Sequence, residues 1–212
     1  MKCVVCGVRK GKRRCPAKTA MICAPCCGEK RVLEIDCPES CEYLKAGRQN
    51  ESSFHARLLV NPDPQYSAKR RRVLTEFKEI FAHIEYFLAS ERQTTRSLTD
   101  KEVAEALSLL LDALRTEEKG IIFERGSSNP YVDGLRRRLG ELIASHRNPE
   151  EPDAPRIKLR DAIEILESVA EVMEGYLHAA PAVRGYVDFL ARICPRKEGS
   201  TSSGSSIIIP GR

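Results

Sequence analysis

The sequence predicts an all-α protein, in which a five-helix bundle-like domain follows a small cysteine-rich N-terminal module. Apolar residues recur at steps of three and four along most of residues 67–195, and no strand-like alternation of any length competes with them. Eight of the nine cysteines lie within residues 3–41, a segment with too few large apolar residues to form a core. At 212 residues, the chain suits one medium and one small domain.

Composition shifts divide the chain into four segments. Residues 1–48 form the cysteine module, and residues 49–66, which end among Pro62 and Pro64, are expected to be a linker. The bundle follows over residues 67–195. The Ser/Gly-rich tail, 196–212, is expected to be disordered, and its three consecutive isoleucines suit either strand addition to a partner's sheet or a loose tail.

Composition also indicates the compartment. A hydrophobic content of 42% and a charged content of 31% describe a globular protein with a polar surface. There is no apolar run near the ~20 residues of a membrane span, and the N-terminus lacks the apolar region of a signal peptide. We therefore expect a cytoplasmic protein, in whose reducing surroundings paired cysteines bind metal rather than form disulfides.

The cysteine spacing is typical of a metal site. Two pairs, Cys3–Cys6 and Cys23–Cys26, have the two-residue separation that lets both thiolates of a knuckle reach one tetrahedral ion, and Cys37–Cys41 has a three-residue version. Gly7 and Gly28 follow two of these cysteines and supply permissive backbone. The eight predicted ligands are Cys3, Cys6, Cys15, Cys23, Cys26, Cys27, Cys37 and Cys41.

Eight cysteines divide into two sites of four thiolates, and two zinc ions are expected. The preferred partition gives one ion Cys3, Cys6, Cys23 and Cys26, and the other ion Cys15, Cys27, Cys37 and Cys41. The adjacent Cys26 and Cys27 can exchange between the two sites. An iron–sulfur cluster and a thiol-redox switch are the alternatives, while a catalytic zinc would keep an open position.

The positive charge of the chain lies in this module. Residues 1–50 carry 11 Lys and Arg against 5 Asp and Glu, whereas the other residues carry 24 against 25. Seven cations are candidate nucleic-acid contacts: Arg9, Lys10, Lys12, Arg13, Arg14, Lys30 and Arg31. The alternative is a solvated loop that offsets thiolate charge. Tyr43 is the module's single aromatic residue, which weakens the case for base stacking.

The order Cys3/Cys6, Cys15-Pro16, the Cys23–Cys27 cluster and a late pair resembles cross-brace zinc modules, the HIT-type zinc finger most nearly. The chain departs from that pattern because Cys15 lacks a near partner and no histidine takes the penultimate ligand position. The string CCGEKRVLEIDCPESCEYL before a helical domain is also similar to a group of bacterial proteins of unknown function. The resemblance to cross-brace zinc fingers implies a module that holds proteins or nucleic acids together.

The first bundle helix is expected to run from Ser67 through an apolar stripe that ends at Leu88. Residues 69–72, Lys-Arg-Arg-Arg, stand in its first turn, where cations oppose the helix dipole. They are therefore expected either to meet phosphate or the acidic pair Glu117–Glu118, or to form a solvated, fraying turn.

The remaining four helices have local start and stop signals. Thr99 with Glu102 forms a capping box for the second helix, and Gly120 ends it. Ser128 or Asn129 caps the third, with Pro130 in its first turn. A proline-acid linker, 148–155, precedes the fourth helix, and Pro181 opens the fifth.

No catalytic arrangement is visible in the sequence. Glu79/His83 and Glu174/His178 stand at i,i+4 rather than the i,i+3 spacing of di-iron bundles, so each pair is expected at a helix surface. Cys194 is expected to be a small buried apolar residue. We therefore expect a non-catalytic adaptor for protein–protein assembly; nucleic-acid binding and a zinc-thiolate redox sensor are the alternatives.

Overall fold

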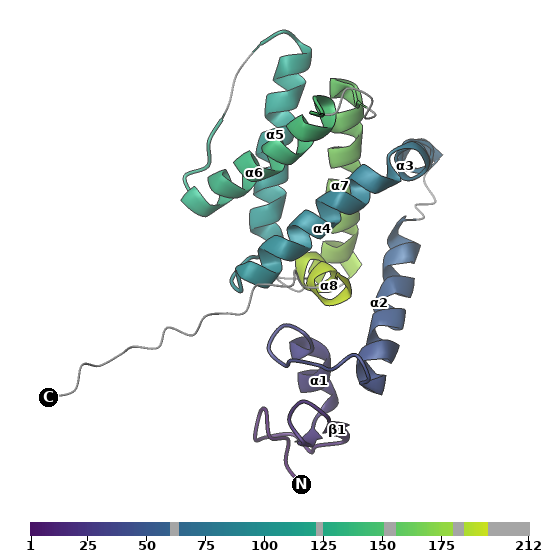
Figure 1. The fold of residues 1–212 in the computed structure, drawn as a ribbon, viewed down its shortest axis with the longest axis vertical. Helices are drawn as coiled ribbons and strands as arrows, with labels where there is room; N and C mark the ends of the chain where they lie inside the picture. Colours follow the sequence, from purple (N-terminus) through teal and green to yellow (C-terminus); the bar gives the residue numbers. More distant parts are fainter. Residues whose placement is uncertain (60–63, 122–124, 151–155, 180–184, 195–212) are drawn as a thin grey trace, which may run out of the picture.

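The computed structural model describes residues 1–59, 64–121, 125–150, 156–179 and 185–194. In this part of the chain, two short strands and eight helices follow one another (Figure 1). Their bounds are β1 Arg13–Cys15, β2 Ala20–Ile22, α1 Ala24–Lys30, α2 Glu42–Leu59, α3 Pro64–Glu76, α4 Lys78–Thr94, α5 Asp100–Glu118, α6 Pro130–Arg147, α7 Leu159–Ala179 and α8 Gly185–Ile193. None of the helices described is both long and apolar enough to cross a membrane.

The mostly helical class is confirmed, but the predicted number of five helices is wrong. One additional helix, α1, lies in the cysteine module, where only knuckles were expected. Another, α2, covers residues 42–59, so most of the expected linker is helical and the expected boundary at residue 48 falls inside a helix. The expected disorder and docking of residues 196–212 lie outside the described residues.

The third additional helix arises because the first bundle helix divides at Phe77. This residue has φ −125° and ψ 22°, although Phe77 N still donates to Val73 O and Phe81 N to Phe77 O, both at 2.9 Å. Neither proline nor glycine occurs there. We attribute the bend to packing, because α3 contacts α7 while α4 contacts α8 most extensively.

Helix α7 is the centre of the bundle and contacts α2, α3, α4, α5, α6 and α8. The apolar stripes predicted for the helices form one core, in which Ile84, Leu107 and Leu139 are fully buried. The local signals are also confirmed. Thr99 and Glu102 form the capping box, Gly120 has φ +77°, and Asn129 caps α6 through the N–H of Tyr131.

Three of the four cations at residues 69–72 lie along α7, and the fourth, Arg71, is exposed. Lys69 pairs with Glu167, Arg70 with Glu171 at 2.6 Å, and Arg72 contacts both Asp161 and Glu164. Glu117, the partner considered from the sequence, pairs instead with Arg147. Helix α3 begins at Pro64, so the expectation that these cations stand in a first turn is wrong, and carboxylates on α7 neutralise three of them in the middle of the helix.

Helix α2 connects the cysteine module to the bundle. Arg48 Nε donates to Arg192 O at 3.2 Å, and Arg192 pairs with Glu51. His55 enters an aromatic cluster, stacked on Phe189 with ring centroids 4.7 Å apart, and its Nε2 lies 3.3 Å from Glu85. Figure 1 accordingly shows the module at the N-terminal end of α2.

The two helical Glu/His pairs do not bring their side chains together as metal ligands. His83 Nδ1 lies 3.0 Å from His146 Nε2 on α6, and His178 Nδ1 lies 2.8 Å from the backbone oxygen of Glu174. Burial, together with the neighbouring His83, lowers the pKa of His146 below its usual 6.5. The fold therefore favours the neutral form of His146.

This pKa shift predicts a pH dependence of stability. The unfolded chain binds more protons at His146 than the folded chain does. The contribution of neutral His146 to the free energy of unfolding is therefore complete above pH 6.5 and is lost as the pH falls through the lowered pKa. We expect His146→Gln to flatten the decrease in unfolding free energy between about pH 7.5 and 5.5. Denaturant titrations of the zinc-loaded protein measure this slope. A slope equal to that of the wild type would contradict the assignment to His146.

Candidate metal centre

Four cysteines of the module converge on one point. The Sγ atoms of Cys3, Cys6, Cys23 and Cys26 all lie within 4.8 Å of one another, and those of Cys6 and Cys23 are 4.0 Å apart. A tetrahedral zinc with bonds of about 2.3 Å separates its sulfur ligands by about 3.8 Å. The set therefore fits one zinc-like ion, and it is the first of the two predicted sets of ligands.

The first pair of ligands is held by a closed loop. Cys3 N donates to Arg9 O and Gly7 N to Cys3 O, both at 2.8 Å. Gly7 has φ +66°, a left-handed conformation that glycine adopts without strain, so its predicted role is confirmed. Val4 N donates to Met21 O, which joins this loop to β2. The loop therefore has little freedom to rearrange.

The second pair stands where the β1–β2 hairpin leads into α1. Strand β1 pairs antiparallel with β2, and Cys23 follows β2 directly. Cys23 is the N-cap of α1, and its Sγ accepts a hydrogen bond from Cys26 N at 3.5 Å. Gly28 lies inside α1 and has no left-handed backbone, so the expected permissive turn at this position is wrong.

Two of the four thiols, Cys3 and Cys26, have very different proton affinities. Burial opposes ionisation of Cys3, but backbone groups of Cys23, Cys6 and Val5 stabilise its thiolate and lower its pKa to about 6. Hydrogen bonding to Cys23 and burial raise the pKa of Cys26 to about 12. Without a cation, the cluster therefore retains protons that metal binding would release.

Arg9 compensates the charge of this cluster. Its pKa is raised by a hydrogen bond with Cys23 and by the charges of Cys23, Cys6 and Cys26. The sequence left two interpretations of the basic loop, contact with nucleic acid and the offset of thiolate charge. The offset of thiolate charge applies to Arg9. A divalent ion bound by four thiolates leaves the site with a net negative charge, and a guanidinium beside the site reduces that charge.

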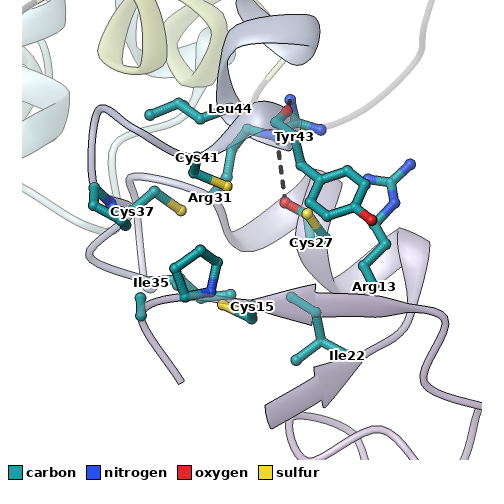
Figure 2. Close-up of a pocket in the computed structure, with 13 residues that line it drawn as sticks. Arg13, Cys15, Ile22, Cys27, Arg31, Ile35, Cys37, Cys41, Tyr43 and Leu44 are labelled. Atoms are coloured by element: carbon teal, nitrogen blue, oxygen red, sulfur yellow. Dashed lines mark hydrogen bonds between the residues drawn. The ribbon is translucent and has the colours of Figure 1, made fainter. Parts of the chain in front are cut away.

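The other four cysteines surround one cavity. Cys15 ends β1, Cys27 lies in α1, Cys37 in the following loop, and Cys41 directly before α2. Figure 2 shows their sulfur atoms around this space, beside Ile22, Ile35 and Leu44. Burial raises the pKa of Cys37, and the charges of Cys41, Cys15 and Cys27 add to that shift. Within the described residues, only the first set has its sulfur atoms within 4.8 Å of one another.

Arg31 lies beside this second cavity. It is 8% exposed, and its guanidinium donates from Nε to Cys27 O at 3.3 Å and from Nη1 to Tyr43 O at 3.2 Å. The residue thus joins α1 to α2, and Figure 2 draws the bond to Cys27. The cysteine spacing gave no signal for this role, because the position of α2 creates it.

Gly47 leaves the space that the Arg31 guanidinium fills. A Cβ on Gly47 would lie 1.1 Å from Arg31 Nη1, so we expect Gly47→Ala to displace the guanidinium and break its bonds to two carbonyls. The loss should exceed the gain of about 1 kcal/mol in helix propensity and lower stability by roughly 1–3 kcal/mol.

Denaturant titration of the zinc-loaded protein measures this effect. The matched control is Gly140→Ala in α6, where the added Cβ would meet Leu110 Cδ1 at an ordinary 3.5 Å. That variant should gain about 0.5–1 kcal/mol. An equal gain for both substitutions would show that Arg31 does not need the space at Gly47.

The remaining predicted nucleic-acid contacts differ in their surroundings. Lys30 Nζ lies 2.5 Å from Glu34 Oε2. The guanidinium carbon of Arg13 lies over the ring of Tyr43, 4.9 Å from its centroid. Lys10, Lys12 and Arg14 are exposed. The seven cations therefore do not form one surface, since Arg31 is buried and Arg9 faces the first thiol cluster.

Comparison of the chain with protein-family models, curated proteins and solved structures finds no match. The resemblance to HIT-type modules therefore rests on the cysteine spacing and on the first thiol cluster alone.

Proposed function

We propose that this chain is a zinc-binding, non-catalytic adaptor of the cytoplasm that assembles with another protein. The cysteine module serves as a rigid platform and the helical bundle as a second surface. The observation that carries the proposal is the first thiol cluster, in which four cysteines could supply all four ligands of a tetrahedral ion. Such closed sites stabilise small modules, whereas catalytic zinc sites usually keep a position for water or substrate.

We further propose a second zinc at Cys15, Cys27, Cys37 and Cys41. Support comes from their shared cavity, since all the cysteines of the module outside the first cluster line it. Their origins also support it, because these residues belong to β1, α1, the intervening loop and the start of α2. An ion here would connect the module to the helix that docks on the bundle.

Metal analysis of protein purified without added metal or chelator tests the number of sites. We expect two zinc ions per chain in the wild type. We expect one zinc ion per chain in each of two double variants, Cys3→Ser/Cys6→Ser and Cys15→Ser/Cys37→Ser. Cobalt substitution should give intense thiolate-to-metal absorption for each site. A single zinc in the wild type, lost only with the first pair of substitutions, would exclude the second site.

Affinity purification at native expression tests the adaptor function. A specific protein should co-purify with the wild type and with Cys194→Ser, whose substituted thiol lies outside the module. It should be lost from Cys3→Ser/Cys6→Ser if the platform is the binding surface. Absence of any specific protein from the wild-type sample would count against an adaptor.

Nucleic-acid binding is the second candidate, favoured by the exposure of Lys10, Lys12 and Arg14. Affinity for a phosphate backbone should fall steeply with salt, and Arg14→Gln should reduce the slope by about one. A Kd that does not respond to salt would exclude this function. A redox sensor has less support, because sensing thiols are accessible whereas Cys3, Cys23, Cys26 and Cys27 are buried.

A further inference from the structure

The loop that carries the first pair of ligands exposes aliphatic side chains. The bond from Cys3 N to Arg9 O closes residues 3–9 into a loop, within which Val4 is 58% and Val8 is 80% exposed. In the described part of the chain, the other exposed large apolar side chains are Met1, Ile121 and, at only 36%, Tyr43. These two side chains offer a small apolar area that a partner could cover.

Among the Lys, Arg, Asp and Glu side chains, this part of the module carries only cations. Residues 1–28 contain seven Lys and Arg and no Asp or Glu. Lys2 and Lys10 form an isolated antiparallel bridge at the base of the loop, and both side chains are exposed. No ion pair with a carboxylate among the described residues involves a cation of this segment, whereas Lys69, Arg70 and Arg72 of α3 meet carboxylates of α7.

The loop is also fixed before any partner arrives. Its backbone is closed by Gly7 N to Cys3 O and by Gly11 N to Met1 O, and it is joined to β2 through Val4. Cys3 and Cys6 belong to the first thiol cluster, so a bound ion would hold both ends of the turn. A surface that is already ordered loses little conformational entropy on binding.

We propose that Lys2, Val4, Val8 and Lys10, here called the knuckle face, bind an acidic segment of another protein that also carries aliphatic side chains. Carboxylates of that segment would approach the lysines, and its aliphatic groups would cover the valines. This inference rests on the proposed adaptor function and specifies the chemistry of the partner. Charge complementarity sets the acidic character, and the exposed valines set the aliphatic character.

The exposed side chains favour a protein over other polyanions. Single-stranded nucleic acids are bound through aromatic stacking, and the module's single aromatic residue, Tyr43, is stacked by Arg13. A phosphate backbone gains nothing from covering valine. Anchoring to an anionic membrane usually requires a larger inserted apolar group than two valines.

Selection from a random dodecapeptide library displayed on phage tests the inference. The zinc-loaded full chain should enrich peptides rich in Asp and Glu that also contain Leu, Ile or Val. Fluorescence polarisation then measures one enriched peptide against the variants. We expect Val4→Ser/Val8→Ser to weaken binding at least tenfold, because both aliphatic contacts are lost.

The matched control is Ile121→Ser, at a residue that is 57% exposed beyond the end of α5. It should leave the affinity for the peptide unchanged. Lys2→Glu/Lys10→Glu should weaken binding at least tenfold and reduce its salt dependence. Unchanged zinc content in each variant shows that a loss of binding does not result from an unfolded loop.

Several results would overturn the inference. Enriched peptides without acidic residues would do so, as would equal affinities of the wild type and Val4→Ser/Val8→Ser. Valine-dependent binding to phosphatidylserine vesicles, or tighter binding to single-stranded RNA than to the peptide, would assign the face to a membrane or to nucleic acid. A co-purifying protein that both face variants retain would leave the adaptor function intact and refute only the knuckle face.

Discussion

Cys26→Ser is expected to abolish metal binding at the first thiol cluster and to unfold the N-terminal part of the cysteine module. Cys26 is 3% exposed, and an ion bound by the first thiol cluster would join α1 to the loop of Cys3 and Cys6 through it. Zinc in small modules supplies binding energy of about 10–16 kcal/mol, which is also folding energy. Loss of one of four thiolates should therefore lower zinc affinity by several orders of magnitude.

Zinc content and amide hydrogen exchange measure this result. We expect one zinc fewer per chain and rapid exchange over residues 1–30, while the helices of the bundle remain protected. Cys194→Ser is the control, because this thiol is partly buried against the bundle core and lies outside the module. Full zinc content in Cys26→Ser, or equal loss in both variants, would contradict the assignment of Cys26 as a ligand.

The first thiol cluster was predictable from the sequence because its information is local. The two-residue spacing of Cys3–Cys6 and of Cys23–Cys26 restricts each pair to one knuckle, whereas the β1–β2 hairpin that brings the two knuckles together was not predicted and the exchange of Cys26 with Cys27 was left open. The helix caps at Thr99 and Asn129 were predictable for the same reason, since a cap involves residues within one turn.

The structural features that the sequence did not reveal depend on contacts between distant residues. The division at Phe77 lies where the chain passes from α3, which packs on α7, to α4, which packs mainly on α8. Apolar periodicity is the same on both sides of Phe77, so it does not reveal the division. Residues 49–59 looked like a linker because α2 is mostly polar. These residues are nevertheless helical, with Phe54 and Leu58 packed on the core and His55 stacked on Phe189.

Charge patterns were the least predictable feature. Seven cations near the thiols looked like one basic surface, yet Arg31 is buried between α1 and α2 and Arg9 faces the first cluster. The cations of α3 were expected to meet phosphate, Glu117–Glu118 or solvent, and Lys69, Arg70 and Arg72 meet α7, about 90–100 residues away along the chain. Sequence distance therefore conceals ion pairs that helix packing creates.

Asp100→Ala is expected to cause the largest loss of stability in the bundle. The Asp100 side chain lies at the start of α5, is 0% exposed, and accepts hydrogen bonds from Tyr186 N and Val187 N, both at 2.9 Å. These two N–H groups belong to the first turn of α8, so a residue from another helix satisfies them. Alanine would leave both donors buried without an acceptor, at a cost of roughly 2–5 kcal/mol in unfolding free energy.

The effect should concentrate on α8 and extend to α2. Because α2 contacts α8 through Arg48 and through the stacking of His55 on Phe189, we expect faster amide exchange in both helices of Asp100→Ala before the rest of the bundle unfolds. Denaturant titration gives the global loss. Asp112→Ala is the control on the same helix; its side chain is 59% exposed and lies 3.9 Å from Arg115, so the change should stay within about 0.5 kcal/mol. Similar losses for the two aspartates would mean that α8 does not depend on Asp100 for its first turn, and that the contacts of α2 with α8 do not depend on Asp100 either.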